Sequence, residues 1–171
     1  MFRNWQQNKI FFKTHKDLDM KIELDSTDKG IINILQHDAK TAYADIGKKL
    51  FISAGTVHAR IKKLERLGII KKTIAQINYA KIGYDITCFL GIYLSKSSMY
   101  NNAKKSLEKI DEVVSVHYTT GQYSMFVKII CLDTNHLRII LSEKIQKIEG
   151  IQRTETLLSL EQSIERPMPI S

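Results

Sequence analysis

The chain has 171 residues, of which 43% are hydrophobic and 26% charged, and it carries a formal net charge of +8. This composition is typical of a folded protein, and the length allows one ordinary domain or two small ones. No apolar run approaches the ~20 residues that a membrane-spanning helix needs, and the N-terminus lacks the apolar core of a signal peptide, so we expect a cytoplasmic protein.

The excess positive charge is confined to the first half of the chain. Residues 1–83 contain 16 Lys and Arg against 8 Asp and Glu, whereas residues 84–171 contain 10 of each kind. One basic half followed by one neutral half predicts a module that binds a polyanion, joined to a second module. Charge alone does not separate DNA from RNA or from an anionic membrane.

Two short helices are predicted at the start of the basic half. Asp25 or Ser26 can cap the first helix, which ends near residues 37–38. Thr41 is in position to cap the second helix. Its predicted inward face consists of Tyr43, Ile46 and Leu50.

A third helix follows a tight turn at residues 51–52. Ser53 can cap this helix, and Gly68 lies where a left-handed residue commonly ends one. Its predicted inward residues, at i, i+4 and i+7, are Val57, Ile61 and Leu64. Three short helices with so tight a link between the last two predict a helix-turn-helix, which we place at residues 22–70.

The outward face of the third helix is expected to bind double-stranded DNA. Small residues near its start allow close approach to a groove, Thr56 and His58 can hydrogen-bond base edges or phosphates, and Arg60 can form a bidentate pair with a guanine. The predicted DNA-binding residues are Ser53, Gly55, Thr56, His58, Ala59, Arg60, Lys62 and Lys63. Further basic residues around this face suit phosphates: Lys48, Lys49, Arg66, Lys71 and Lys72. An amphipathic helix with ordinary solvated charges is the alternative.

The neutral half alternates strand and helix patterns after a linker, residues 71–85, that is predicted to form a β-strand. Strands are predicted at 86–95, 113–119, 123–132 and 151–160, and helices at 101–110 and 136–148. The order βαββαβ predicts one antiparallel sheet with both helices on one face, over residues 86–165, followed by a tail at 166–171. The fold class is therefore α+β: an N-terminal winged helix-turn-helix and a ferredoxin-like βαββαβ sandwich. The first strand is apolar on both faces, which favours a second subunit over the open face.

The sequence contains no P-loop, no GxGxxG after a strand, no GxSxG elbow and no metal-binding histidine spacing. We therefore expect no catalytic residues, no metal and no cofactor, and we expect Cys88 and Cys131 to be buried thiols. Two polar clusters remain, at residues 119–124 and 154–156, and together they can hydrogen-bond a small zwitterion. Turn chemistry alone would explain Gly121 in the first cluster. The predicted effector-binding residues are Thr120, Gly121, Gln122, Tyr123, Ser124, Thr154, Glu155 and Thr156.

Five segments, taken in order, resemble the Lrp/AsnC family of transcriptional regulators. They are LDSTDKGIINIL, ISAGTVHARIKKLERLGII, IGYD, YTTGQYSMFVKI and RTETLLSL, between about Ile22 and Arg166. Ser124 stands where many members have Asp, and with the preceding TTG and the later RTETL it resembles the AsnC branch. The resemblance implies a regulator with asparagine as effector and asparagine synthetase as a regulated gene. It also implies homodimers joined through their C-terminal sheets, assembled as octamers, with the effector between dimers.

Members of this family usually begin shortly before the LDxxD segment. Residues 1–21 are therefore set apart as an extra N-terminal segment. Its residues 1–19 are either an ordered arm or the product of a wrongly chosen upstream start, and we favour Met20 as the natural start. Two alternatives stay open: an enzyme on the same two-domain plan, such as a decarboxylase of haem biosynthesis, and an RNA-binding module. The enzyme would need acid–base residues around a pocket, whereas His117 stands nearly alone, and the strand at 123–132 lacks the pattern that stacks RNA bases.

Overall fold

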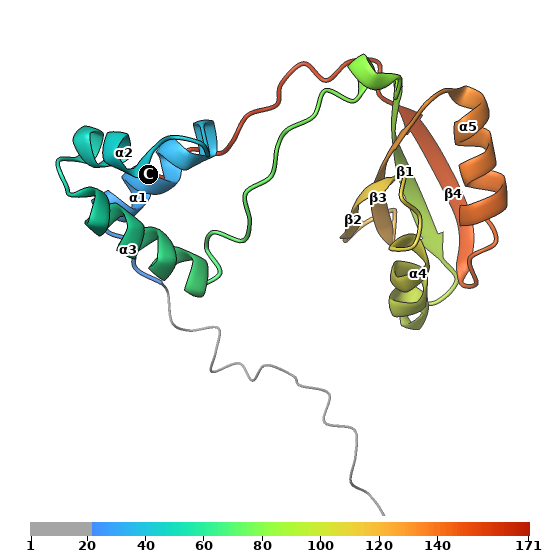
Figure 1. Cartoon of the computed structure of the whole chain (residues 1–171). Helices are drawn as coiled ribbons and strands as arrows, with labels where there is room; N and C mark the ends of the chain where they lie inside the picture. Colours follow the sequence, from blue (N-terminus) through green and yellow to red (C-terminus); the bar gives the residue numbers. More distant parts are fainter. Residues whose placement is uncertain (1–21) are drawn as a thin grey trace, which may run out of the picture. The chain divides into compact units, whose positions relative to one another are not determined.

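The computed structural model describes residues 22–171, which divide into two compact units (Figure 1). Of the described residues, the first unit contains 22–74 together with 166–171, and the second contains 75–165. The segment 1–21, interpreted above as extra, lies outside the described residues. Within residues 22–171, no helix is both long and apolar enough to cross a lipid bilayer.

The first unit is built from three helices, α1 (Ser26–His37), α2 (Tyr43–Leu50) and α3 (Ala54–Arg66). Each helix contributes to one buried apolar cluster, which consists of Ile31, Ile32, Ile46, Val57, Ile61 and Leu64. The inward spacing predicted for the third helix is confirmed, because Val57, Ile61 and Leu64 are its buried residues.

Two of the three predicted helix caps are confirmed. The Asp25 side chain accepts a hydrogen bond from the backbone N–H of Asp28, and the Ser53 side chain accepts one from the N–H of Thr56. These bonds satisfy N–H groups that have no partner inside their helix. The starts of α1 and α3 are therefore determined by local side-chain chemistry.

The prediction for the start of α2 is wrong. Its N-cap is Ala42, because the Thr41 hydroxyl instead donates to the carbonyl oxygen of Asp38 at 2.8 Å and closes the preceding turn. Tyr43, expected on the inward face, is 40% exposed. As the first residue of α2 it lies at the rim of the unit, with its ring centroid 5.8 Å from that of His58.

The tight turn between α2 and α3 depends on a close backbone approach at Gly47. Phe51 ends α2 in the left-handed conformation, with φ 57° and ψ 42°, and its side chain is 96% exposed. A Cβ atom at Gly47 would lie 2.6 Å from the carbonyl oxygen of Ile52. The bare backbone of Gly47 therefore permits the chain to turn directly into α3. Gly68, after α3, has the predicted positive φ, 71°.

The β-strand predicted in the linker, residues 71–85, is not formed. Residues 71–79 have no helix or strand, and a single 3-10 turn, η2 (Ala80–Ile82), follows. An extended segment becomes a strand only when its backbone N–H and C=O groups pair with a neighbouring segment. Within residues 22–171, every strand pairing involves β1 to β4 of the second unit, so the linker has no partner.

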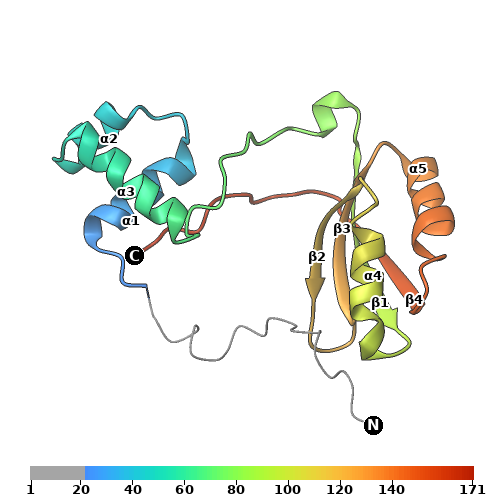
Figure 2. The ribbon, with the colours of Figure 1, turned by 60° about the horizontal axis from the view of Figure 1, so that its bottom comes forward.

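The second unit has the predicted βαββαβ order. Its strands are β1 (Ile86–Leu94), β2 (Val113–Tyr118), β3 (Met125–Cys131) and β4 (Ile151–Leu158), and its helices are α4 (Tyr100–Leu107) and α5 (Thr134–Ile139). A 3-10 turn, η3 (Ser97–Met99), precedes α4, and a π-helical segment, η4 (Ile140–Ile145), continues α5. The sheet order is β2-β3-β1-β4 with all pairs antiparallel, and α4 and α5 lie along it (Figure 2). The ferredoxin-like sandwich is confirmed.

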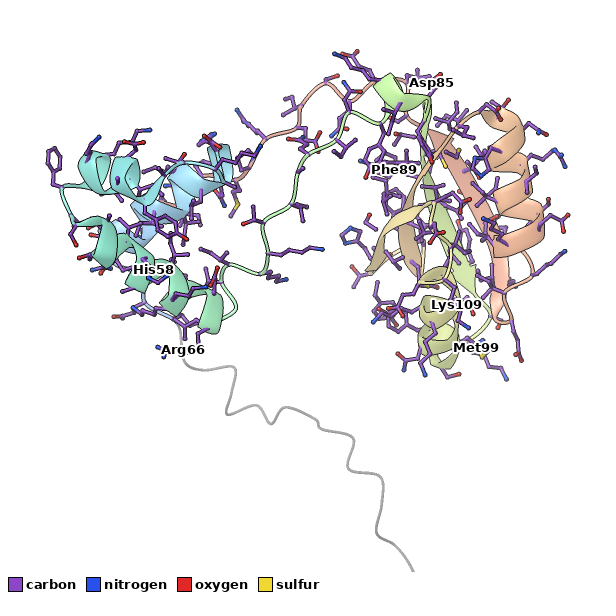
Figure 3. All side chains as sticks on the ribbon, in the orientation of Figure 1. His58, Arg66, Asp85, Phe89, Met99 and Lys109 are labelled. Atoms are coloured by element: carbon purple, nitrogen blue, oxygen red, sulfur yellow. The ribbon has the colours of Figure 1, made fainter. Side chains whose placement is uncertain are left out.

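The central strand β1 divides its side chains between two faces of the sheet. Cys88, Leu90 and Ile92 are buried in the cluster formed with the helices. Phe89 projects to the other face, where its ring stacks on Phe126 with centroids 5.6 Å apart (Figure 3). Cys88 is a buried free thiol, and burial raises its pKa to about 11. The helix-free face of the sheet thus carries aromatic side chains, as expected from the two-sided apolar pattern of β1.

Gly47→Ala is expected to lower the free energy of unfolding of the first unit by ~1–3 kcal/mol, although alanine is the better helix former. The added methyl group would overlap the Ile52 carbonyl oxygen, which cannot retreat without opening the turn. Gly55→Ala is the matched control, because the nearest atom to its Cβ would be the Ser53 Oγ at 3.8 Å. Amide hydrogen exchange of α1–α3 measures both variants, and equal protection would contradict the steric role of Gly47.

Candidate functional site

The exposed face of α3 carries most of the predicted DNA-binding residues. The following residues at this face are exposed in the structure: Ser53, Gly55, Thr56, His58, Ala59, Lys62 and Lys63. Arg66 shares the line of Gly55, Ala59 and Lys62, because three- and four-residue steps stay on one side of a helix. Figure 3 shows Arg66 at the carboxyl-terminal end of α3. From the sequence, Arg66 was expected only among the basic residues around this face that contact phosphates.

Small residues and short polar side chains occupy the start of this face. The Ser53 hydroxyl caps α3 and also lies 2.9 Å from the hydroxyl of Thr56. Lys62 forms an ion pair with Glu65 at 2.8 Å, and the hydrogen bond that Lys62 donates to the Glu65 carboxylate raises the pKa of Lys62. Exposed ion pairs of this kind contribute little to stability. The Lys62 ammonium group can therefore exchange its partner for a phosphate at small cost.

The prediction that Arg60 points outward is wrong. Its Nη1 atom donates to Asp25 Oδ2 at 2.6 Å and to Asp28 Oδ1 at 2.7 Å, and both acceptors lie at the start of α1. The Arg60 side chain is 28% exposed. Its hydrogen bonds with Asp25 and Asp28 raise the pKa of Arg60. The guanidinium group that was expected to pair with a guanine is instead bound to the neighbouring helix.

Asp28 explains why Arg60 turns inward. Of the charged residues that the structure describes, Asp28 alone is buried, with 1% of its side chain exposed. A buried carboxylate is costly unless it is paired and hydrogen-bonded. Arg60 supplies that bond, and the ammonium group of Lys63 lies 3.5 Å from Asp28 Oδ2, which accepts no hydrogen bond. The charge of Asp28 thus holds the middle of α3 against the start of α1.

Asp25 adds a second link between the two helices. Hydrogen bonds from the backbone N–H of Asp28 and from Arg60 lower the pKa of the Asp25 carboxyl group. One carboxylate therefore caps α1 with one oxygen, Oδ1, and binds α3 with the other, Oδ2.

In the second unit, hydrogen bonds close the loop between β2 and β3 on itself and hold it to β1. The Thr119 hydroxyl donates to the carbonyl oxygen of Tyr123 at 2.7 Å, and Ser124 Oγ accepts from the backbone N–H of Leu94 at 3.2 Å. Gly121, at the tip of the loop, has φ 103°, and a Cβ added there would meet no atom within 4 Å. The loop therefore has a defined shape. Position 121 favours glycine because of its left-handed backbone conformation, since there is space for a side chain. Thr120 and Gln122 flank it and are exposed.

The predicted polar cluster on β4 is divided between the two faces of the sheet. Thr154 and Thr156 pair with Ile92 and Leu90, so they share the face that bears the helices. Glu155 pairs with Gly91 and projects to the opposite face. The prediction that these three residues act together is wrong, because successive side chains of a strand alternate.

Glu155 lies at the centre of a cluster of polar and aromatic side chains, which we call the Glu155 cluster. Its carboxylate accepts hydrogen bonds from the hydroxyls of Tyr123 at 2.9 Å and Tyr93 at 3.0 Å, and pairs with Arg153 at 2.9 Å. The Arg153 guanidinium lies 4.0 Å from the centroid of the Tyr93 ring, and the Gln122 amide donates to the Tyr93 hydroxyl at 2.9 Å. The hydrogen bonds from Tyr123 and Tyr93 lower the pKa of Glu155, and the bond to Glu155 raises the pKa of Tyr123.

Tyr93 and Arg153 are members of this cluster that the sequence analysis missed. They are direct partners in the pairing of β1 with β4. Alternation along β4 was the only available signal, and it places Arg153 on the same face as Glu155. The register between two strands separated by more than fifty residues cannot be read from one sequence. A cation, the Arg153 guanidinium, therefore lies beside the Glu155 carboxylate.

Comparison with known proteins agrees with this arrangement. Residues 24–65 match the model of the AsnC-type helix-turn-helix domain, and residues 87–169 match that of the Lrp/AsnC ligand binding domain. The chain is 44% identical over 143 residues to Regulatory protein AsnC of Haemophilus influenzae, covering 84% of this chain and 95% of that protein. It is 41% identical to Regulatory protein AsnC of Escherichia coli strain K12, covering 84% and 94%. The solved structure of E. coli AsnC matches with a TM-score of 0.82 at 39% identity, covering 86% of this chain and 99% of that one.

Arg60→Ala is expected to lower the free energy of unfolding of the first unit by about 3 kcal/mol, because it removes the hydrogen-bonding partner of a buried carboxylate. In an Asp28→Asn background the same change should cost less, so the two effects are not additive. Lys62→Ala is the control, since its ion pair is exposed. Denaturant unfolding of the single and double variants measures the coupling, and additive effects would show that Arg60 does not act through Asp28.

Proposed function

Since this chain belongs to the Lrp/AsnC family of transcriptional regulators, we propose that α3 reads operator DNA and that asparagine is the effector bound by the second unit. The family membership, with both an AsnC-type helix-turn-helix and a ligand-binding domain, makes the chain a regulator that binds DNA and a small molecule. Identity of 41–44% to two AsnC proteins over nearly their full length is the observation that carries the choice of asparagine. The regulated genes would be those of amino-acid metabolism, such as asparagine synthetase.

For DNA, the proposal divides the residues of α3 by what each side chain can reach. Gly55 and Ala59 allow the helix to approach the base edges, and Thr56 hydrogen-bonds a base or a phosphate. Lys62, Lys63 and Arg66 supply phosphate contacts from the exposed face, with Ser53 and His58 at its rim. Arg60 contributes by fixing the orientation of α3 through Asp25 and Asp28, as its hydrogen bonds indicate.

For the effector, we place asparagine at the loop of residues 120–124 beside the Glu155 cluster. Arg153 supplies a cation for the α-carboxylate, and Glu155 is an acceptor for the α-ammonium group once a tyrosine hydroxyl yields its place. The side-chain amide needs both a donor and an acceptor, which Gln122, the loop backbone and the tyrosine hydroxyls provide. The charges of Arg153 and Glu155 already balance, so the extra carboxylate of aspartate would be desolvated without compensation. Thr154 and Thr156 lie on the other face of the sheet and are not part of this proposed site.

The proposal includes self-association. The face of the sheet away from α4 and α5 carries the stacked rings of Phe89 and Phe126, and Leu157 on β4 is 48% exposed. A second copy of the chain would cover this apolar surface and form a homodimer. Assembly of dimers into an octamer follows the family resemblance, and light scattering of the purified chain tests it.

Thr56→Val is expected to weaken binding to a selected operator by ~1–3 kcal/mol and to relax the preference at one base position per half-site. The change keeps the shape of the side chain and removes only its hydroxyl. Lys71→Ala should instead weaken binding to all DNA sequences alike. It should also make the plot of log affinity against log salt concentration shallower, by about one unit of slope. Fluorescence anisotropy with operator variants at several salt concentrations measures both. An unchanged base preference in Thr56→Val would remove Thr56 from the reading face.

Asparagine is expected to bind the purified chain more tightly than aspartate in calorimetric titrations. Gly121→Ala should weaken that binding, because φ 103° is a left-handed conformation that alanine adopts only with strain. Gly83→Ala is the matched control, since φ there is 92° and Gly83 lies outside the loop. DNA binding without effector should be the same in both variants. Equal affinity for the two amino acids, or no heat from asparagine at millimolar concentration, would refute the proposed effector.

A further inference from the structure

The last residues of the chain, 166–171, belong to the first unit, although the whole second unit precedes them. The backbone N–H of Ile170 donates to Asn33 Oδ1 at 2.9 Å, and the backbone carbonyl of Ile170 accepts from Asn33 Nδ2 at 2.9 Å. Asn33 lies on α1, 137 residues earlier in the chain. One side-chain amide thus satisfies both backbone groups of one residue, as a neighbouring strand would.

The side chain of Ile170 is bound as well as its backbone. It is partly buried and packs against the apolar cluster of α1, α2 and α3. Met168, two residues earlier in the same tail, is 77% exposed. The contact therefore selects one side chain and one set of backbone groups, which is how proteins recognise extended peptides.

The composition of the tail favours docking. The chain has two prolines, Pro167 and Pro169, and both are in this segment. Proline fixes φ and has no backbone N–H, so the tail has few alternative conformations, and the N–H of Ile170 directly follows a residue that has none. A peptide that is already restricted loses less conformational entropy when it binds.

The tail also joins α1 to the strand that carries the Glu155 cluster. β4 ends at Leu158, and twelve residues of fully extended chain reach at most about 40 Å. Covalent attachment over such a length makes the effective concentration of Ile170 on the order of millimolar, so that one side chain and two hydrogen bonds are enough for docking.

We propose that α1 carries a binding site for the chain's own carboxyl terminus, in which Asn33 binds the backbone of Ile170 and the apolar cluster binds its side chain. The docked tail is a second tether from β4 to the DNA-binding unit, in addition to the linker at residues 71–85. The site involves neither the exposed face of α3 nor the Glu155 cluster, so it does not depend on the identity of the effector.

Hydrogen exchange of the full-length chain tests the site with two pairs of variants. Ile170→Asp places a charge in the site, whereas Met168→Asp places the same charge on an exposed tail residue. Asn33→Ala removes the amide, whereas Gln36→Ala removes an exposed amide from the same helix. Alanine is the stronger helix former, so lost protection in Asn33→Ala cannot come from a weaker α1.

Ile170→Asp and Asn33→Ala are expected to speed amide exchange in the tail by about tenfold, the change that ~1.4 kcal/mol produces. The two controls, Met168→Asp and Gln36→Ala, are expected to leave the exchange rate unchanged. The double variant should exchange no faster than either single variant. Equal exchange in Ile170→Asp and Met168→Asp would overturn the proposal. Co-expression of Asn33→Ala chains with Ile170→Asp chains tests the tether: restored protection would show that the tail docks on another copy, and would overturn an intrachain tether.

Discussion

The arrangement of the DNA-binding unit depends on the buried carboxylate of Asp28. A charge in this position requires a partner, and the partner, Arg60, comes from α3. Arg60 therefore serves the packing of α3 on α1 instead of extending toward a base. With Asp25 holding the same guanidinium group, the rotation of α3 about its axis is determined by electrostatics as well as by the apolar cluster.

In the second unit, the pairing of β1 with both β3 and β4 assembles the candidate effector site. Tyr93 and Gly91 on β1 lie opposite Arg153 and Glu155 on β4. Gly91 has no side chain, which leaves room for the Tyr123 ring, because a Cβ there would lie 2.5 Å from that ring. The loop that carries Tyr123 is in turn held to β1 through Ser124. Three segments that are distant in sequence thus converge on one carboxylate.

Local signals in the sequence predicted most of the elements. The caps at Asp25 and Ser53 and the i, i+4, i+7 spacing in α3 involve only residues within one or two turns, and all were confirmed. Thr41 failed because its hydroxyl had a second local acceptor, the carbonyl of Asp38. The linker failed as a strand because strand formation requires a partner segment, and β-rich composition does not supply one.

Apart from the linker, the sequence by itself determined the order of helices and strands, the division into a basic and a neutral half, and the family to which the chain belongs. These properties follow from periodicity, charge and short motifs, all of which are local in the chain. Only the tertiary structure decided that Arg60 binds Asp28, that Glu155 and not the flanking threonines joins Tyr93 and Tyr123, and that Ile170 returns to Asn33. Each of these contacts joins residues from different elements. Their partners are set by helix packing, strand register and the path of the chain, which no local pattern encodes.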